Sequence, residues 1–169
     1  MRNVTRKCRA CGKRITRGRY CNDGCLARAA RRRQRERDKA DPDSRYWRAK
    51  ADALWSLLVR ADAGGQCEVC GAEHTQAHHL IPKQVRAYRW ELRNGIALCR
   101  KHHKFDRQLS AHGGTIGFFI WLREHRADRW AWARDAYRAL ATPRGVPVPH
   151  ARDEYERLAR IAERAKEKA

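Results

Sequence analysis

The sequence predicts an α+β protein that is mostly helical and is built around small metal-stabilised elements. Three observations support this fold class. The seven cysteines lie in two groups, at 8–25 and 67–99, with short spacings typical of zinc ligands. Two short apolar stretches, at 80–81 and 96–98, are bounded by a proline or by Asn-Gly and favour short strands. Apolar residues recur at helical spacing in much of the remaining chain.

The charge of the chain indicates a nucleic-acid partner. The 169 residues include 39 Lys and Arg against 19 Asp and Glu, a net charge of +20. The first fifty positions hold 18 of the basic residues and 5 acidic ones, which leaves +13 before Ala51. Such a concentration of positive charge attracts the phosphate backbone of nucleic acids.

An anionic membrane surface is the alternative partner of a basic chain, but the sequence offers no spanning segment. The longest apolar run, 117–122, is too short to cross a bilayer. The N-terminus also lacks the apolar core of a signal peptide. We therefore expect an intracellular location, where cysteines stay reduced and bind metal instead of forming disulfides.

Residues 1–40 are expected to form a basic zinc-binding module. Paired knuckles at the spacing found here are typical of a four-ligand zinc site. About forty residues cannot bury an adequate core without such a metal. The alternative interpretation is a set of free thiols in a disordered basic arm. The predicted zinc ligands are Cys8, Cys11, Cys21 and Cys25.

The stretch 26–39 is predicted to continue as a helix with arginines on all faces. A helix with so little apolar stripe does not pack on a core, but it can lie along phosphates. Such contacts give affinity and not sequence choice. The alternative is a solvated, partly disordered charge run. The DNA-binding candidates in this stretch are Arg28, Arg31, Arg32, Arg33 and Arg35.

A second helix is predicted from 45 to 63. Ser44 is its expected N-cap, and Gly64-Gly65 end it. We expect this helix to brace the hairpin that follows, because the hairpin is too small to stand alone. The residues of its expected core face are Trp47, Leu54, Trp55, Leu58 and Val59.

The segment 67–112 combines a second zinc cluster with histidines that this cluster does not need. Two cysteine or histidine pairs, each with two intervening residues, supply the four N and S ligands that zinc prefers. Apart from the poorly placed His74, four further histidines are then candidates for chemistry. The predicted zinc ligands are Cys67, Cys70, Cys99 and His102, and the four candidates are His78, His79, His103 and His112.

His78 and His79 are neighbours on a predicted strand. Adjacent strand residues point to opposite faces, so the two imidazoles are not expected to hold one ion. One can bind metal while the other stays free as a base. Asn94-Gly95 predicts a turn, and 96–98 the returning strand. A helix over 101–109 would carry His103 back toward this hairpin.

At these residues the sequence resembles the HNH endonucleases, which have a ββα-metal core. The order and spacing are similar to those of small phage-encoded members, and the resemblance covers about residues 66–122. It departs from the family at His102, where many relatives have a fourth cysteine, although mixed Cys/His zinc sites are common. The matching motifs are Cys67-x-x-Cys70, Ala-His-His-Leu-Ile-Pro at 77–82, Asn-Gly-Ile-Ala-Leu-Cys at 94–99 and His102-His103-Lys104.

The resemblance implies roles for individual residues. His79 would be the general base, and Asn94 would fix its ring by accepting the ring N–H. His78 and His103 would hold a catalytic divalent ion, which could be Mg²⁺, Mn²⁺, Ni²⁺ or Zn²⁺. The substrate would be DNA, most simply a duplex, cut to 3′-hydroxyl and 5′-phosphate ends.

The resemblance leaves the last ligand of the catalytic ion open between His112 and Asp106. It also suggests a phage origin, with the host cytoplasm as location and phage packaging proteins as partners.

The loop 82–93 adds basic residues beside the expected site. Lys83, Arg86 and Arg89 are mixed with aromatic residues and are predicted to contact DNA. Trp90 and Leu92 are instead expected to pack beneath the loop.

Three helices are predicted after the histidines. The first, capped by Thr115, runs to about His125, and the second covers 130–140. We expect a nuclease domain over 44–141, a proline-rich linker over 142–149 and a C-terminal helix within 150–169. This last helix could dock back, bind a partner or stand loose. The residues on the expected core side of the second helix are Trp130, Ala133, Tyr137 and Leu140.

Two functions of different classes follow from these patterns. A metal-dependent DNA endonuclease is motivated by the order of His78-His79, Asn94 and His103. A non-catalytic zinc-containing DNA-binding protein, such as a regulator or packaging accessory, is motivated by the charge of +20 and the two cysteine clusters. RNA as substrate is a third, weaker hypothesis.

Overall fold

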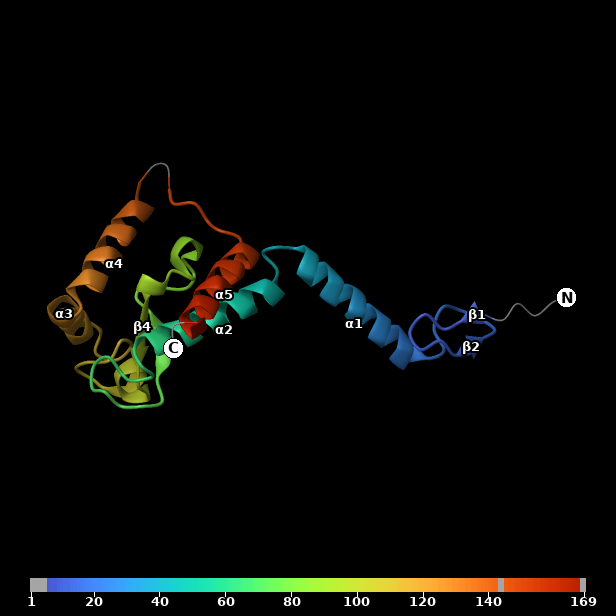
Figure 1. Cartoon of the computed structure of the whole chain (residues 1–169), viewed down its shortest axis with the longest axis horizontal. Helices are drawn as coiled ribbons and strands as arrows, with labels where there is room; N and C mark the ends of the chain where they lie inside the picture. The colour runs from blue at the N-terminus through green and yellow to red at the C-terminus, as the bar shows by residue number, and fades with distance from the viewer. Residues whose placement is uncertain (1–5, 143–144, 168–169) are drawn as a thin grey trace. The chain divides into compact units, whose positions relative to one another are not determined.

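The computed structural model describes residues 6–142 and 145–167 and confirms a mostly helical α+β fold (Figure 1). The chain divides into two compact units, Met1–Trp47 and Arg48–Ala169. The elements in order are β1 (Arg6–Lys7), β2 (Arg14–Ile15), α1 (Asp23–Ala40), α2 (Arg45–Asp62), β3 (Gln76–His79), η1 (Arg86–Tyr88), η2 (Leu92–Asn94), β4 (Gly95–Leu98), η3 (Lys101–Phe105), α3 (Thr115–His125), α4 (Ala127–Leu140) and α5 (Ala151–Glu167).

The smaller unit consists of a short hairpin followed by helix α1. Strands β1 and β2 pair antiparallel, with Arg6 opposite Ile15. Helix α1 begins three residues before the predicted start, because the Asn22 side chain accepts a hydrogen bond of 2.8 Å from the Cys25 N–H. Cys25 and Ala29 are its buried residues, so only the first turns of α1 pack on the hairpin side of the unit.

Helix α2 confirms the predicted core face in part. Trp55 and Val59 are buried together with Ala51, which the sequence analysis did not single out, at helical spacing. The other predicted residues, Trp47, Leu54 and Leu58, are half-buried. The Ser44 hydroxyl donates to the Asp38 carbonyl at the end of α1. Gly65, with a φ of 75°, ends the segment by donating its N–H to the Arg60 carbonyl, as a glycine C-cap does.

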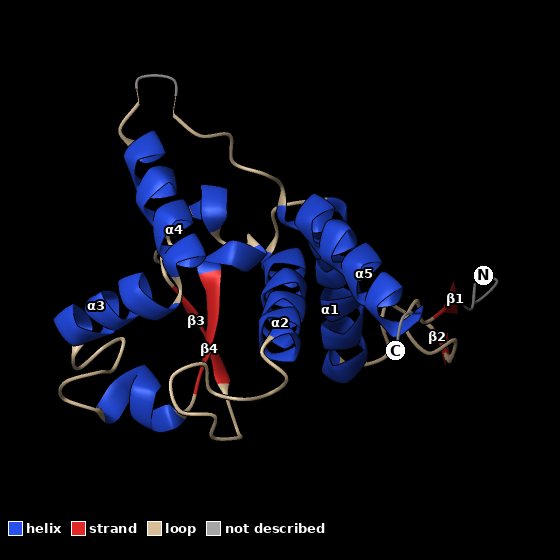
Figure 2. Cartoon of the chain, turned by 60° about the vertical axis from the view of Figure 1, so that its left-hand side comes forward, coloured by secondary structure: helices blue, strands red, loops and turns tan. Residues whose placement is uncertain are grey.

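The centre of the larger unit is an antiparallel hairpin of β3 and β4. Its register places His78 opposite Ile96 and His79 opposite Gly95. Figure 2 shows these strands between α3 and α4 on one side and α2 and α5 on the other. A Cβ atom at Gly95 would collide with the Val59 side chain, so glycine is needed for α2 to pack directly on the hairpin.

The core of the larger unit joins β4 and α3 through apolar contacts. The carboxylate of Glu68, which lies between Cys67 and Cys70, adds hydrogen bonds to this packing. Glu68 accepts hydrogen bonds from the Ala97 N–H at 3.1 Å and from Arg126 Nε at 2.8 Å. It therefore links the cysteine knuckle to β4 and to the junction of α3 and α4. The members of the core cluster are Cys67, Ile96, Leu98, Cys99, Ala111, Phe118 and Leu122.

Two helical predictions in this region are wrong. The helix expected over 101–109 is a single π-type turn, η3, which ends at Phe105. It stops there because Asp106 Oδ1 accepts hydrogen bonds from the N–H groups of Gln108 and Leu109 and turns the chain. Thr115 does not cap α3 but is its first residue, after Gly114.

Helix α4 begins at Ala127, three residues before the predicted start, and its Tyr137 is not a core residue. The Tyr137 side chain is 68 % exposed, whereas Ala136 is buried. The helix therefore sits rotated from the orientation that its apolar spacing suggested.

Helix α5 packs against the rest of the larger unit, so of the three alternatives for this segment the structure shows the docked one. Leu158 and Ala151 are fully buried. Arg157 Nη2 donates 2.9 Å to the Trp90 carbonyl, and the Lys50 ammonium lies 4.7 Å from the centre of the Tyr155 ring. Part of the predicted linker, 143–144, lies outside the described residues. No helix in the described part of the chain is long and apolar enough to cross a membrane.

Candidate active site

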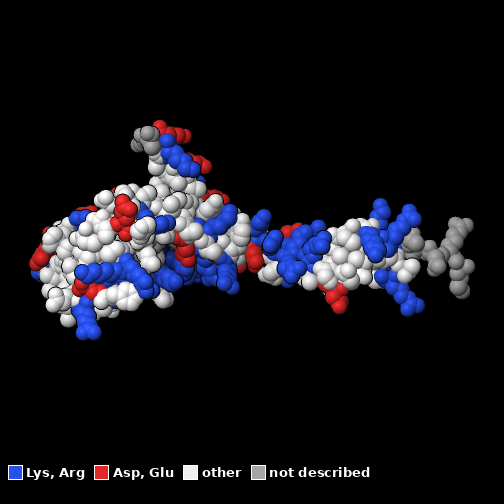
Figure 3. Space-filling view, turned by 90° about the horizontal axis from the view of Figure 1, so that it is seen from below, with Lys and Arg blue, Asp and Glu red and all other residues white. Residues whose placement is uncertain are grey.

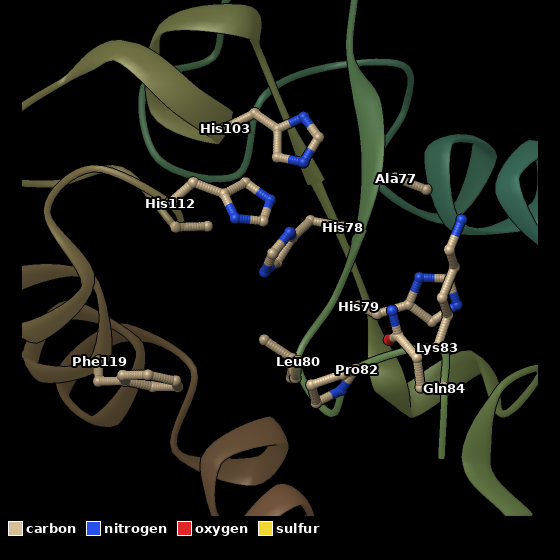
Figure 4. Close-up of a pocket in the computed structure, with 11 residues that line it drawn as sticks. Ala77, His78, His79, Leu80, Pro82, Lys83, Gln84, His103, His112 and Phe119 are labelled. Atoms are coloured by element: carbon tan, nitrogen blue, oxygen red, sulfur yellow. The ribbon is translucent and has the colours of Figure 1, made fainter. Parts of the chain in front are cut away.

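Three histidines from three separate segments converge at one end of the hairpin. His78 comes from β3, His103 from η3, and His112 from the loop before α3. Their ligand nitrogens all lie within 4.8 Å of one another. The ring centroids are 4.9 to 5.2 Å apart, and the rings point toward a common space (Figure 4). This group, His78, His103 and His112, is called the histidine triad below.

The loop that carries His112 is fixed to the η3 turn by main-chain hydrogen bonds. The Ala111 N–H donates to the His102 carbonyl, and the His112 N–H donates to the His103 carbonyl. The same loop lies against α3, where a Cβ at Gly117 would overlap the Gln108 carbonyl. These contacts place His112 beside His103.

Of the two ligands that the sequence left open, the structure brings His112 into the triad. Asp106 instead uses its carboxylate in the turn after η3 and forms an ion pair of 3.5 Å with Lys101. Among the described residues, the metal-ligand group around His78 contains only histidines.

The electrostatic surroundings favour neutral imidazoles at His78 and His103. Burial, with help from neighbouring His103 and His112, lowers the pKa of His78 to about 3. Burial is also the main reason why the pKa of His103 is lowered. A neutral imidazole has a free lone pair, which is the form that binds a metal ion.

Gln76 is a functional candidate that the sequence analysis missed. Its Oε1 atom lies 2.6 Å from His103 Nδ1, so the ring donates its Nδ1–H to the amide oxygen. The proton is thereby held on Nδ1, and Nε2 is left free as a ligand. Strand alternation could have identified Gln76, because it precedes His78 by two residues and therefore shares its face.

His79 lies on the opposite face of β3 and has a separate environment, as strand geometry predicts. Its ring stacks on Trp55, with centroids 3.7 Å apart and an interplanar angle of 13°. Its Nε2 atom lies 2.9 Å from the Arg89 carbonyl oxygen, which can only accept. Nε2 therefore carries the proton, and Nδ1 is the atom available to act as a base. Burial lowers the pKa of His79, against the opposing effect of the Arg89 carbonyl and the Asp52 carboxylate.

The expectation that Asn94 accepts the N–H of His79 is wrong, because other groups occupy its side chain. Asn94 is fully buried. Its Oδ1 accepts from the Ile81 N–H at 2.7 Å, and its Nδ2 donates to the carbonyls of Ile81 and Tyr88 at 3.0 and 2.9 Å. It holds the loop 82–93 against the hairpin, and the Arg89 carbonyl takes the position beside His79.

A pocket of about 440 Å³ opens at the triad. His78, His79, His103 and His112 all contribute to its lining, as does the exposed Lys83. Figure 4 shows the triad on one side of the β3 ribbon and His79 with Lys83 on the other. The site is thus open to a large ligand at the point where the imidazoles gather.

The loop residues predicted to contact DNA divide into two groups. Lys83 is exposed at the pocket, whereas Arg86 is half-buried. Arg89 is half-buried and committed to Asp52 through two hydrogen bonds of 2.8 and 2.6 Å. Arg89 therefore braces the loop through Asp52, and its contact with DNA stays a prediction.

The second cysteine cluster has the geometry of a closed zinc site. The distance from Cys99 Sγ to His102 Nδ1 is 3.4 Å, from Cys67 Sγ to the same nitrogen 3.6 Å, and from Cys70 Sγ to Cys99 Sγ 3.9 Å. A tetrahedral zinc with ordinary bond lengths has ligand separations of about 3.6 Å for S and N and about 3.8 Å for two S atoms. The donor set fits zinc.

The N-terminal cluster has similar dimensions. Cys21 Sγ lies 3.4 Å from Cys25 Sγ and 3.6 Å from Cys11 Sγ, and Cys8 completes the group. Burial acts to raise the pKa of the Cys8 thiol, but the backbone N–H groups of Ala10, Cys11 and Cys21 lower it to about 6. Amides that point at the sulfur favour the thiolate, which is the form that binds zinc.

The arginines of α1 form the exposed basic surface of the smaller unit. Arg33 donates to the Tyr20 hydroxyl at 2.6 Å, and Arg32 lies 3.7 Å from Glu36. Figure 3 shows Lys and Arg side chains predominating over Asp and Glu on the visible face of each unit. The exposed side chains predicted to bind DNA on α1 are Arg28, Arg31, Arg32, Arg33 and Arg35.

Comparison with known proteins identifies the part of the chain that holds the hairpin. Residues 67–111 match the sequence model of a family described as HNH endonuclease. No curated protein and no solved structure matched the chain. The segment that carries His78, His79, His103 and the second cysteine cluster is therefore an HNH endonuclease domain, at residues 67–111.

Proposed function

We propose that this protein is a metal-dependent endonuclease that hydrolyses DNA phosphodiester bonds. One observation carries the proposal. A group of three histidine nitrogens within 4.8 Å of one another lies in the same pocket as a fourth imidazole, His79, whose ring is held by Trp55 and the Arg89 carbonyl. The match of this segment to the HNH endonuclease family supports the same chemistry.

His79 is the proposed general base. Its Nε2–H is engaged by the Arg89 carbonyl, so Nδ1 accepts a proton from an attacking water. Its lowered pKa keeps the ring neutral near pH 7, which is the form that can accept. Stacking on Trp55 restricts the plane of the ring and therefore the direction of the Nδ1 lone pair.

The histidine triad is the proposed site of the catalytic divalent ion. When bound, Mg²⁺, Mn²⁺, Ni²⁺ or Zn²⁺ would stabilise negative charge on the phosphate and the leaving oxygen. His78 and His103 hold neutral ring nitrogens toward this position, and Gln76 fixes the ring of His103. Lys83 adds a positive charge at the rim that can contact a phosphate.

The two cysteine clusters are the proposed structural zinc sites, and the α1 arginines are proposed to bind the DNA backbone. We retain a division into a basic module (1–40), a nuclease domain (44–141), a linker (142–149) and a C-terminal helix (150–169), with α5 docked on the nuclease. An intracellular site of action, and packaging proteins as partners, stay predictions.

Plasmid nicking by a base-deleted variant tests the proposal. His79→Ala should reduce nicking with Mg²⁺, Mn²⁺ or Ni²⁺ by at least about 100-fold, because general-base catalysis contributes 10² to 10⁴. Zinc content and DNA retardation should stay at the wild-type level. His125→Ala, which alters an exposed histidine on α3, is the control and should nick normally. Undiminished nicking by His79→Ala would refute the assignment.

The second candidate is a non-catalytic zinc protein that binds DNA, favoured by the charge of +20. In that case the wild-type protein would retard DNA but would not nick it with any of the three ions. Parallel assays on matched DNA and RNA duplexes separate the RNA hypothesis from both.

A further inference from the structure

A second pocket, of about 450 Å³, adjoins the histidine pocket. The two pockets share the side chains of Leu80, Pro82 and Phe119. Figure 4 shows these three residues together on the side of the histidine pocket away from His103. A polymer with one phosphate at the triad can therefore extend directly into this second pocket, which is called the aromatic groove below.

The lining of the groove is apolar and aromatic, and its rim is cationic. Phe119 and Trp130 form one wall, with ring centroids 6.0 Å apart. Tyr137 stands on α4 with 68 % of its side chain exposed, and the small Ala133 lies nearby in the lining. Arg134 and Arg138 complete the groove.

This combination matches the chemistry of a nucleotide. Aromatic rings stack on the faces of bases whatever their sequence, and adjacent guanidiniums attract the linking phosphates. A cationic ligand is a poor occupant of the groove, because the net charge of +20 repels positively charged molecules. Bases inside an intact duplex are already stacked, so only an unpaired or extruded base can enter such a groove.

We propose that the aromatic groove binds an unstacked base of the DNA strand, next to the phosphate that is cut. The proposal rests on the proposed nuclease function and narrows its substrate class. The preferred substrate is DNA with an unpaired nucleotide beside the cleavage site, such as a bulge, an overhang or a branch. Tyr137 stacks on the base, and Arg138 contacts a neighbouring phosphate.

The proposal can be tested through binding, without cleavage. The readout is the fluorescence of an unpaired 2-aminopurine in a short DNA duplex. The measurement is made in the His79→Ala background, so that the DNA stays intact. We expect 2-aminopurine to be quenched on binding, and Tyr137→Ala to weaken this binding about tenfold. Tyr137→Phe, which keeps the ring, should bind as before. Leu57→Ala is the matched control, because Leu57 is a 52 % exposed apolar residue on α2.

Cleavage rates give the second readout. Protein with wild-type His79 should cut the duplex with the unpaired nucleotide faster than the fully paired duplex, and Tyr137→Ala should remove most of this preference. Equal binding and cleavage of the two DNAs by wild-type protein, with no effect of Tyr137→Ala, would overturn the groove proposal and leave the nuclease intact.

The remaining outcomes separate the groove from the nuclease function. Quenching that depends on Tyr137, in a protein that never nicks DNA, would support the groove and refute the proposed function. A Tyr137→Ala variant that changes only the thermal stability or the oligomeric state would assign the groove to packing or to a second copy of the chain, and the proposal would fall.

Discussion

Two groups of candidate metal ligands lie in the same hairpin-centred unit and differ in every respect that bears on function. The first, Cys67, Cys70, Cys99 and His102, has four donors, three of them on buried residues, and distances that match a filled tetrahedron. The histidine triad has three donors and opens into a pocket. A closed set of ligands stabilises a fold, whereas an incomplete one leaves coordination positions for a substrate.

The two groups meet at adjacent residues, which shows how little chain is needed to separate the two roles. His102 is buried and points its Nδ1 toward the cysteines, whereas His103 is half-exposed and faces His78. Neighbouring residues on the single η3 turn point in different directions, so the turn supplies one ligand to each group. The comparison predicts different consequences for mutations in the two groups.

The largest effect is expected from removing a buried cysteine. Cys67→Ala should release one zinc ion and unfold the larger unit at room temperature, because structural zinc binding, on the order of 10 kcal/mol, is comparable to the whole stability of a domain. Circular dichroism on heating and zinc analysis check this outcome. If Cys67→Ala melts at the wild-type temperature, the first group is not structural.

Removing a triad ligand should leave the fold intact and remove most of the activity. His103→Ala is expected to reduce plasmid nicking by about 100-fold or more, because the site for charge stabilisation is lost. The melting temperature should fall by only a few degrees, since the side chain is half-exposed. Unfolding of His103→Ala as severe as that of Cys67→Ala would remove the distinction between the two groups.

A smaller effect is expected from the residue that positions His103. Gln76→Ala should raise the Mn²⁺ concentration needed for half-maximal nicking by about 10- to 100-fold, because such supporting hydrogen bonds tune metal affinity by that factor. The rate at saturating Mn²⁺ should change little. Glu73→Ala is the control, since Glu73 is exposed on the loop that leads to β3. Equal Mn²⁺ requirements in Gln76→Ala and the wild type would show that Gln76 does not support the triad.

The smallest effect is expected from Asp52, which binds the side chain of Arg89, the residue whose carbonyl contacts His79. Asp52 binds Arg89 and also accepts from Trp90 Nε1 at 2.8 Å. Burial opposes ionisation of Asp52, but the hydrogen bonds from Arg89 and Trp90 dominate and lower its pKa. A lowered pKa stabilises the fold above the unfolded-state value of about 3.9, and this contribution disappears as the pH falls through the folded-state value.

Asp52→Asn should therefore lower the free energy of unfolding by about 1 kcal/mol at pH 7. The effect is modest because the carboxylate is partly exposed and therefore screened by solvent. The difference in unfolding free energy between the variant and the wild type should shrink below about pH 4. Urea unfolding at several pH values measures it. A difference that is constant from pH 7 to pH 3 would show that the charge of Asp52 is not the cause.

The sequence was sufficient where a local rule determines the structure. Ligand spacing predicted both cysteine clusters, and the alternation of strands predicted that His78 and His79 point apart. The apolar stretch at 96–98 predicted β4, but the turn predicted at Asn94-Gly95 is wrong, because Asn94 ends η2 and Gly95 is the first residue of the strand. The recognisable part of each feature is a short spacing, the two residues between paired ligands or the two-residue period of a strand, and a pattern specifies such spacings.

The sequence was insufficient where a side chain chooses between distant partners. Asn94 is bonded to Ile81 and Tyr88, and Arg89 is paired with Asp52 across 37 positions. Glu68 is bonded to Arg126, 58 positions away. Spacing carries no information about such contacts. The length of η3 was also unpredictable from periodicity, because the turn at Asp106 ends it.

Stepwise removal of metal is the measurement that tests the two-group account most directly. Zinc content, melting temperature and nicking are followed in the same sample during dialysis against increasing concentrations of a chelator. The account predicts that nicking is lost first, while two zinc ions and the fold are retained, and that added Mn²⁺ restores it. Nicking that persists until the protein unfolds, or zinc lost together with the first loss of nicking, would contradict it.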